Sequence, residues 1–385
     1  MTPAAHGLPG YAELAVGGLR HLGHVLGLGP AFDASAEESV SALFGGWGHR
    51  STRGPAEPGQ PAAPAPFEYS LVLSGDRVDI RLFYRPLAAT GPTTAEASWE
   101  EGRRTLAELE RRGVAHLARA RDLGDLFRPR SERATIGMCL AASAGAEGIS
   151  GVKVYFDTFA AGPGHHQELL GEALGRLGHS TAWDWVRRHD PAGVAALMPA
   201  ICALDLQDSS DARIKFYTTV HERSAAELAA RAAALSDGAG HAAADFVERM
   251  AVGGSAALAG DGLRPTLCWS MTSHRTDRPD DATLYLPSNR YAPSGADITD
   301  RLRTALAPGL FHRVERLIAQ CAGATPGEGT EKDPERAPAN PFHWVGTKLV
   351  RYERSLTLYL SAAAVEAARS AFPTRPAVAR TAAGR

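Results

Sequence analysis

Charged and aromatic side chains alternate with apolar ones in two short stretches of the sequence. In "RIKFY", residues 213–217, a guanidinium, an ammonium and a phenol occupy every second position, and "KVYFD", residues 153–157, repeats part of this pattern. Side chains of a β-strand point alternately to opposite faces, so Arg213, Lys215 and Tyr217 share one face. That face suits an anion, although an ordinary half-buried strand with a solvated basic side gives the same pattern.

The same alternation along five strand-like segments brings more cations and phenols to one face. These positions hold Arg81, Lys153, Tyr155, Arg213, Lys215, Tyr217, Thr283, Tyr285, Thr357 and Tyr359. Arginine and lysine suit a phosphate or diphosphate, because one offers a planar fork of donors and the other a compact charge. A tyrosine ring face stabilises a nearby cation. Together they predict a site for a phosphate ester that ionises.

Motifs for nucleotide or metal chemistry are missing from the sequence. It contains no G-x-x-x-x-G-K-[ST] loop, and the acidic run "DRPDD", residues 277–281, lacks the helical spacing of a magnesium-diphosphate site. We therefore expect the basic side chains to take the metal's role, with no cofactor required and Mg²⁺ not essential.

Glu68 stands at the start of the first strand-like segment, in "PFEYSL", and shares the phase of Ser70. As a surface carboxylate it would be unremarkable. In a cation-rich cavity it would instead accept a hydrogen bond from an N–H or O–H group of a substrate.

The elements that must position these residues recur along the chain as pairs of strands followed by helical sequence. Five such pairs occur, and Tyr155, Tyr217, Tyr285 and Tyr359 recur in steps of about 60 to 75 residues. Strands joined by short turns are antiparallel, and helical connections cover one face of the sheet. About ten strands with helices on one side would leave two long edges unless the sheet closes. The sequence thus predicts an α+β fold, a closed antiparallel barrel with outer helices and a polar lumen.

Composition limits the class of protein and its partners. The chain has 385 residues, 44% of them hydrophobic, and a net charge of −2, which argues against broad binding to nucleic acid or membranes. Its four cysteines form no C-x-x-C pair and read as buried free thiols of a reducing compartment, so we expect a cytoplasmic protein. No apolar run reaches the length of a membrane span.

We expect a single domain over residues 1–385, acting as a monomer or homodimer. It would comprise N-terminal helices in residues 1–50, a Pro/Gly-rich linker in 51–66, the barrel with its helices in 67–371 and a flexible tail in 372–385.

Six motifs in one order carry a resemblance to a known family. "PFEYSL", "RLF", "KVYF", "RIKFY", "LYLP" with "RY", and "LTLYLS" span roughly Pro66 to Ser361 and resemble the dimethylallyltryptophan synthase family of indole prenyltransferases, of bacterial type. Each motif alone is weak evidence for the family, but six motifs in the same order are specific to it. The resemblance implies the ABBA prenyltransferase barrel of repeated ααββ units, with ten antiparallel strands.

The resemblance also implies roles for individual residues. Glu68 would accept the indole N–H as the catalytic carboxylate, and the diphosphate would bind Arg81, Lys153, Arg213 and Lys215. A shield around the allylic cation would comprise Tyr155, Tyr217, Tyr285, Trp344 and Tyr359, with Trp344 replacing a tyrosine of many relatives. Fungal relatives carry a lysine upstream of "KVYF" that is proposed to accept the ring proton. "RATIGMCLAASAG" contains no lysine, so the final base and the alkylated ring position stay open.

The expected activity is metal-independent transfer of a dimethylallyl or geranyl group from its diphosphate to the indole ring of tryptophan or a tryptophan-derived metabolite. The expected partners are these small molecules. Two alternatives remain open, a prenyltransferase for a phenolic acceptor and a barrel that only binds a ligand.

Overall fold

The computed structural model describes residues 9–52, 65–130, 134, 136–162, 164–189, 201–261, 263–324, 340–350 and 355–372. Within these ranges ten strands form one closed antiparallel barrel, which confirms the predicted fold class. The strands are β1 (Phe67–Ser74), β2 (Arg77–Tyr84), β3 (Met138–Gly145), β4 (Gly148–Asp157), β5 (Ile201–Asp205), β6 (Ile214–Thr219), β7 (Thr266–Met271), β8 (Asp281–Pro287), β9 (Phe342–Lys348) and β10 (Ser355–Ser361).

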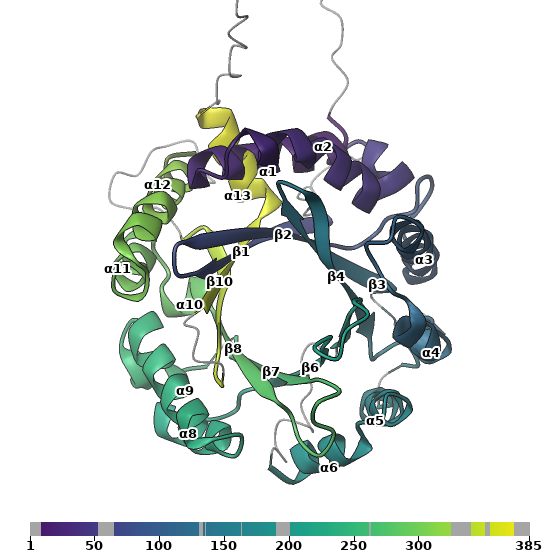
Figure 1. The fold of residues 1–385 in the computed structure, drawn as a ribbon. Coiled ribbons are helices and arrows are strands. Elements are labelled where there is room, and N and C mark those ends of the chain that lie inside the picture. Colours follow the sequence, from purple (N-terminus) through teal and green to yellow (C-terminus); the bar gives the residue numbers. More distant parts are fainter. Residues whose placement is uncertain are drawn as a thin grey trace, which may run out of the picture.

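Each strand pairs with its neighbours in sequence, and β1 closes the ring by pairing with β10. Helices surround the ring of strands on the outside (Figure 1). They are α1 (Tyr11–Leu26), α2 (Pro30–Phe44), α3 (Ala95–Arg111), α4 (Ala118–Phe127), α5 (His166–Arg176), α6 (Ser180–His189), α8 (Ala225–Ala233), α9 (Asp237–Met250), α10 (Ser288–Tyr291), α11 (Gly295–Ala305), α12 (Pro308–Ala324) and α13 (Ala362–Ala371), with short 3₁₀ helices η1 (Gly45–His49) and η2 (Gly254–Ala259). No described helix is both long and apolar enough to cross a membrane.

The strands alternate between an apolar outer face and a polar inner face. On β10, Leu358 and Leu360 are fully buried, whereas Thr357 and Tyr359 keep accessible surface. The buried side packs on helices, as Phe216 of β6 does by meeting Trp183 of α6 edge to face at 5.5 Å. Since Thr357 and Tyr359 face the inside of a closed ring, their accessible surface means that the lumen is hollow.

The first and last described helices meet on one side of the barrel, where α1 contacts both α2 and α13 (Figure 1). The contact between α1 and β1 is close. The Tyr69 hydroxyl donates to the Ala15 carbonyl at 3.2 Å, and a Cβ at Gly18 would lie 2.0 Å from that hydroxyl oxygen. Glycine at this position therefore lets α1 settle on the barrel wall.

Some element boundaries differ from the sequence-based expectation. The sequence predicts helical structure from about Ser98 to Asp122, and the structure divides this stretch into two helices, because α3 ends at Arg111 and α4 begins at Ala118. Gly113 adopts a φ of +73° after the first helix, the left-handed conformation that commonly ends helices. The linker and tail predicted for 51–66 and 372–385 lie mostly outside the described residues, at 53–64 and 373–385.

Candidate active site

The predicted site residues lie on the inner face of the barrel. Directly paired residues on neighbouring strands share a face. Trp344 pairs with Tyr359, Tyr359 with Ser70, and Ser70 with Arg81, which carries one face from β9 to β2. Tyr155 pairs with Ala203, which pairs with Lys215.

A cluster of basic side chains gathers around one buried carboxylate. Lys153 Nζ lies 2.9 Å from Asp205 Oδ1, and Arg213 Nε lies 2.7 Å from Asp205 Oδ2. Asp205 is 3% exposed. Lys215 has neither a hydrogen bond nor an ion pair with any described residue, and the buried Arg81 Nε also lacks a partner among them. Asp205 thus neutralises part of the positive charge, while Lys215 and Arg81 keep N–H donors that can form hydrogen bonds with a ligand.

Burial sets the protonation of this cluster. It lowers the pKa of Lys153 to about 8 and that of Lys215 to about 7, although the charge of Asp205 opposes both shifts. Burial would also raise the pKa of Asp205, but Lys215, Lys153 and Arg213 outweigh it and hold that pKa well below its usual range. A bound polyanion would stabilise the protonated lysines.

Aromatic rings form an arc along the same lumen. The rings of Tyr217 and Tyr285 are 6.2 Å apart, and those of Tyr285 and Tyr359 are 5.9 Å apart with edge-to-face geometry. The Tyr285 ring lies over Gly346, where a Cβ would approach it to 2.6 Å. These rings keep partial exposure inside the barrel, so their surfaces face the hollow.

Glu68 lies at the end of the barrel where helices connect the strands. It lines a cavity of about 430 Å³ together with Phe83, Arg85, Cys139 and His343. Burial raises the pKa of Glu68 to about 7, and its carboxylate makes no hydrogen bond with a described residue. The Glu68 carboxylate is therefore available as a hydrogen-bond acceptor for a ligand in a cavity with largely apolar walls.

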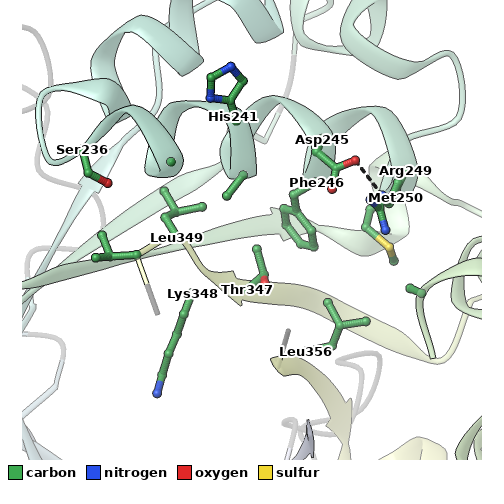
Figure 2. A pocket seen from close by; sticks show the side chains of 14 residues that line it. Ser236, His241, Asp245, Phe246, Arg249, Met250, Thr347, Lys348, Leu349 and Leu356 are labelled. Carbon is green, nitrogen blue, oxygen red and sulfur yellow. Dashed lines mark hydrogen bonds and ion pairs between the residues drawn. The ribbon is translucent and has the colours of Figure 1, made fainter. Parts of the chain in front are cut away.

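A second cavity, of about 630 Å³, lies outside the barrel between α9 and the strands β9 and β10. Figure 2 shows His241, Asp245 and Arg249 along α9, with the last two joined at 2.7 Å. None of the predicted site residues lines it. Lys348 points away from α9 in this view, and its pairing with Thr283 places it on the lumen face.

Comparison with solved structures identifies the architecture. A 5-dimethylallyltryptophan synthase from Streptomyces coelicolor matches with a TM-score of 0.74 and 25% identity, over 93% of this chain and 99% of that chain. The chain has the dimethylallyltryptophan synthase fold. This confirms the resemblance seen in the sequence, although no family model and no curated protein matches the sequence.

Two further structures share the dimethylallyltryptophan synthase fold. A 6-dimethylallyltryptophan synthase from Micromonospora olivasterospora, in complex with DMASPP and Trp, has a TM-score of 0.71 and 21% identity, over 93% of this chain and 99% of that chain. The prenyltransferase PriB, in a ternary complex with L-tryptophan and dimethylallyl thiolodiphosphate, also has a TM-score of 0.71, with 23% identity over 92% and 97% of the two chains.

Sequence reasoning missed several inner-face residues. Asp205 ends β5 in phase with Ala203 and directly opposite Lys153, and Phe83 contacts the Tyr155 ring edge to face at 5.1 Å. The available signal was the same two-residue alternation, applied to the first strand of each pair as well as the second. Lys348 and Arg85 could have been found in the same way.

Proposed function

We propose that this chain, as one domain, is an aromatic prenyltransferase that transfers a prenyl group from an allylic diphosphate to the indole ring of tryptophan or a tryptophan-derived metabolite. The observation that carries this proposal is the joint presence, in one hollow barrel, of a cation cluster, an arc of tyrosine rings and a cavity that contains the Glu68 carboxylate. The neighbours, including one solved with DMASPP and Trp, support the same substrates.

In this proposal the diphosphate binds Arg81, Lys153, Arg213 and Lys215. As the allylic C–O bond breaks, its electron pair stays on the leaving diphosphate, and the cations stabilise the charge that develops there. This assignment is supported by Arg81 Nε and Lys215, which make no hydrogen bond with any described residue. Because these cations supply the stabilisation, we propose that a metal ion is not essential.

The allylic cation would then lie among Tyr155, Tyr217, Tyr285, Trp344 and Tyr359. Ring faces stabilise a cation by about 0.5 to 2 kcal/mol each, more when water is excluded. The rings also keep water from capturing the cation before a carbon of the indole attacks it. The ring proton leaves afterwards, and aromaticity returns.

Glu68 would orient the acceptor. Its carboxylate accepts a hydrogen bond from the indole N–H. This bond strengthens as positive charge develops on the ring while the indole attacks the allylic cation. No base for the ring proton is assigned, since the inner-face residues of β3 are Cys139, Ala141 and Ser143.

The experiment is a product analysis by mass spectrometry. The protein is incubated with dimethylallyl or geranyl diphosphate and with tryptophan, tryptophan-containing dipeptides or a phenolic acceptor. A prenylated indole with equimolar diphosphate supports the proposal. Product only from the phenol would establish the phenolic alternative, and donor binding without diphosphate release would indicate a binding protein.

We further propose that the protein works in the cytoplasm. Cys139, Cys202, Cys268 and Cys321 are all buried and form no disulfide, which fits a reducing compartment.

A further inference from the structure

A second charged side chain lines the cavity that contains Glu68. Arg85 follows β2, and its backbone N–H donates to the Pro66 carbonyl at 2.8 Å, which extends the pairing of β1 with β2 by one step. Arg85 lies two residues beyond Phe83 and four beyond Arg81, so it shares their inner-face phase. Its side chain therefore lies on the lumen side, at the mouth of the barrel.

The Arg85 guanidinium is uncommitted. It is half-buried, and it makes no hydrogen bond or ion pair with any described residue. Elsewhere in the lumen, Arg213 is held by Asp205 at 2.7 Å. A half-buried arginine without a partner has lost part of its hydration and gains from a ligand carboxylate, which its planar fork can bind with two hydrogen bonds.

The lining of the cavity limits what the guanidinium can bind. Among the described residues that line the cavity, Arg85 is the one with a permanently charged basic side chain. Burial lowers the pKa of His343, which also lines the cavity, so its imidazole is neutral near pH 7. The cavity thus has one acidic side chain at Glu68, one basic side chain at Arg85 and apolar walls between them.

The positions of Glu68 and Arg85 along the barrel wall fit an amphipathic acceptor. Pro66, the backbone partner of Arg85, precedes Glu68 by two residues, which is about 7 Å along a strand. Arg85 therefore lies further toward the mouth than Glu68. An indole whose N–H reaches Glu68 can extend a substituent over this distance to the Arg85 guanidinium, since both residues line the same cavity.

We propose that Arg85 binds the carboxylate of the acceptor, so that the preferred substrate is a free α-amino acid or a peptide with a free carboxylate on its tryptophan, rather than an indole that lacks this group. This inference rests on the proposed function and names the substrate class of the same site. Arg85 acts on specificity, because its partner is remote from the bonds that form and break.

The test compares two acceptors that differ in the carboxylate alone. L-Tryptophan and tryptamine are each assayed with saturating dimethylallyl diphosphate, using the wild-type chain, Arg85→Gln and Arg85→Lys. Arg77→Gln is the matched control, since Arg77 is exposed and lies on the same strand and face at the other end of the barrel.

We expect Arg85→Gln to lower kcat/KM for L-tryptophan by about ten- to a hundredfold, because a charge-assisted bidentate bond is lost. Most of the loss should appear in KM, since the contact is equal in the ground and transition states. Tryptamine should change by less than about twofold, because it has no carboxylate to lose. Arg85→Lys should recover part of the loss with tryptophan, and Arg77→Gln should leave both acceptors unchanged.

Equal losses with both acceptors would overturn the inference, since Arg85 would then only support the cavity wall. Unchanged kcat/KM for tryptophan in Arg85→Gln, or a wild-type preference for tryptamine, would overturn it as well. In each of these cases the chain still prenylates an indole, so the proposed function stands. If the wild-type chain prenylates neither acceptor, the proposed function fails and the assignment of Arg85 fails with it.

Discussion

At the residue scale, burial opposes the charge of one carboxylate, Glu68, and of two lysines, Lys153 and Lys215. Glu68 and Lys215 are the two with a pKa near neutrality. Glu68 has a pKa raised to about 7 and Lys215 a pKa lowered to about 7. Both groups sit close to their titration points at neutral pH, so small changes in their surroundings alter their charge. This arrangement is common where side chains take part in chemistry.

Glu68→Gln tests the acceptor assignment. The amide nearly preserves shape but carries no charge, so turnover with an indole should fall by about ten- to a hundredfold. Protonation removes the wild-type charge below the raised pKa, and wild-type kcat/KM should therefore fall as the pH drops below about 7. The variant should lack this acid limb. An N-methylated indole is the control, because it has no proton to donate and should lose little further activity.

Asp205→Asn tests whether the buried carboxylate supports the cation cluster. The charge of Asp205 raises the pKa values of Lys153 and Lys215, so its removal lowers them further. The lysines then lose their charge at lower pH, and the alkaline fall in kcat/KM for the donor should move down by about one unit. Near pH 6, donor affinity should stay equal or improve, because one negative charge near the diphosphate is gone. A uniform loss at all pH values would instead indicate damage to the fold.

At the scale of strands, function depends on which side chains the register turns inward. A shift of one residue would exchange the polar and apolar faces of a strand. On β10 the shift would replace Tyr359 in the lumen by Leu358 or Leu360.

Tyr359→Ala tests this register. If the ring shields the allylic cation, its loss should admit water, and the ratio of free prenyl alcohol to prenylated product should rise severalfold. The matched control is Tyr69→Phe, a change on the helix-facing side of β1, where the hydroxyl donates to Ala15. Unchanged coupling in Tyr359→Ala would mean that Tyr359 does not shield the cation.

Gly18→Ala tests the packing of α1 on the barrel. The added Cβ would meet the Tyr69 hydroxyl at 2.0 Å, so the helix or ring must move, and we expect a loss of about 1–3 kcal/mol in the free energy of unfolding. Urea unfolding measures it. Gly124→Ala on α4 is the control, since a Cβ there meets nothing within 4 Å and should stabilise by about 0.4–1 kcal/mol. Equal behaviour of the two variants would contradict the close contact.

At the scale of the whole molecule, closing the sheet concentrates positive charge inside a chain whose net charge is −2. The lumen can therefore attract a polyanion although the chain as a whole carries a small negative net charge. Helices on the outside cover the apolar strand faces, which leaves the inner face free to be polar.

Because the lumen supplies its own cations, prenyl transfer should persist in excess EDTA. Turnover measured after chelation should stay within about twofold of the untreated rate, since the proposed transition-state stabilisation comes from fixed side chains. Complete loss in EDTA, restored by Mg²⁺ alone, would contradict the role given to Arg81, Lys153, Arg213 and Lys215. Partial stimulation by Mg²⁺ would not, because a metal can assist release of the diphosphate.

The sequence by itself determined the barrel and the inner face of its strands. Strand alternation is a local property with a period of two, so Arg213, Lys215 and Tyr217 could be assigned to one face without knowing their neighbours. The repeated strand pairs then required a closed sheet, because an open one would leave two long edges.

The tertiary structure decided which inward residues meet. Asp205 lies 52 residues from Lys153 in sequence yet 2.9 Å from it in space, because β4 and β5 pair across a long helical connection. Arg85 and Glu68 share a cavity for a similar reason, since the pairing of β1 with β2 sets how far each lies from the barrel mouth. Such contacts depend on register and barrel closure, which bring together residues that no local pattern relates.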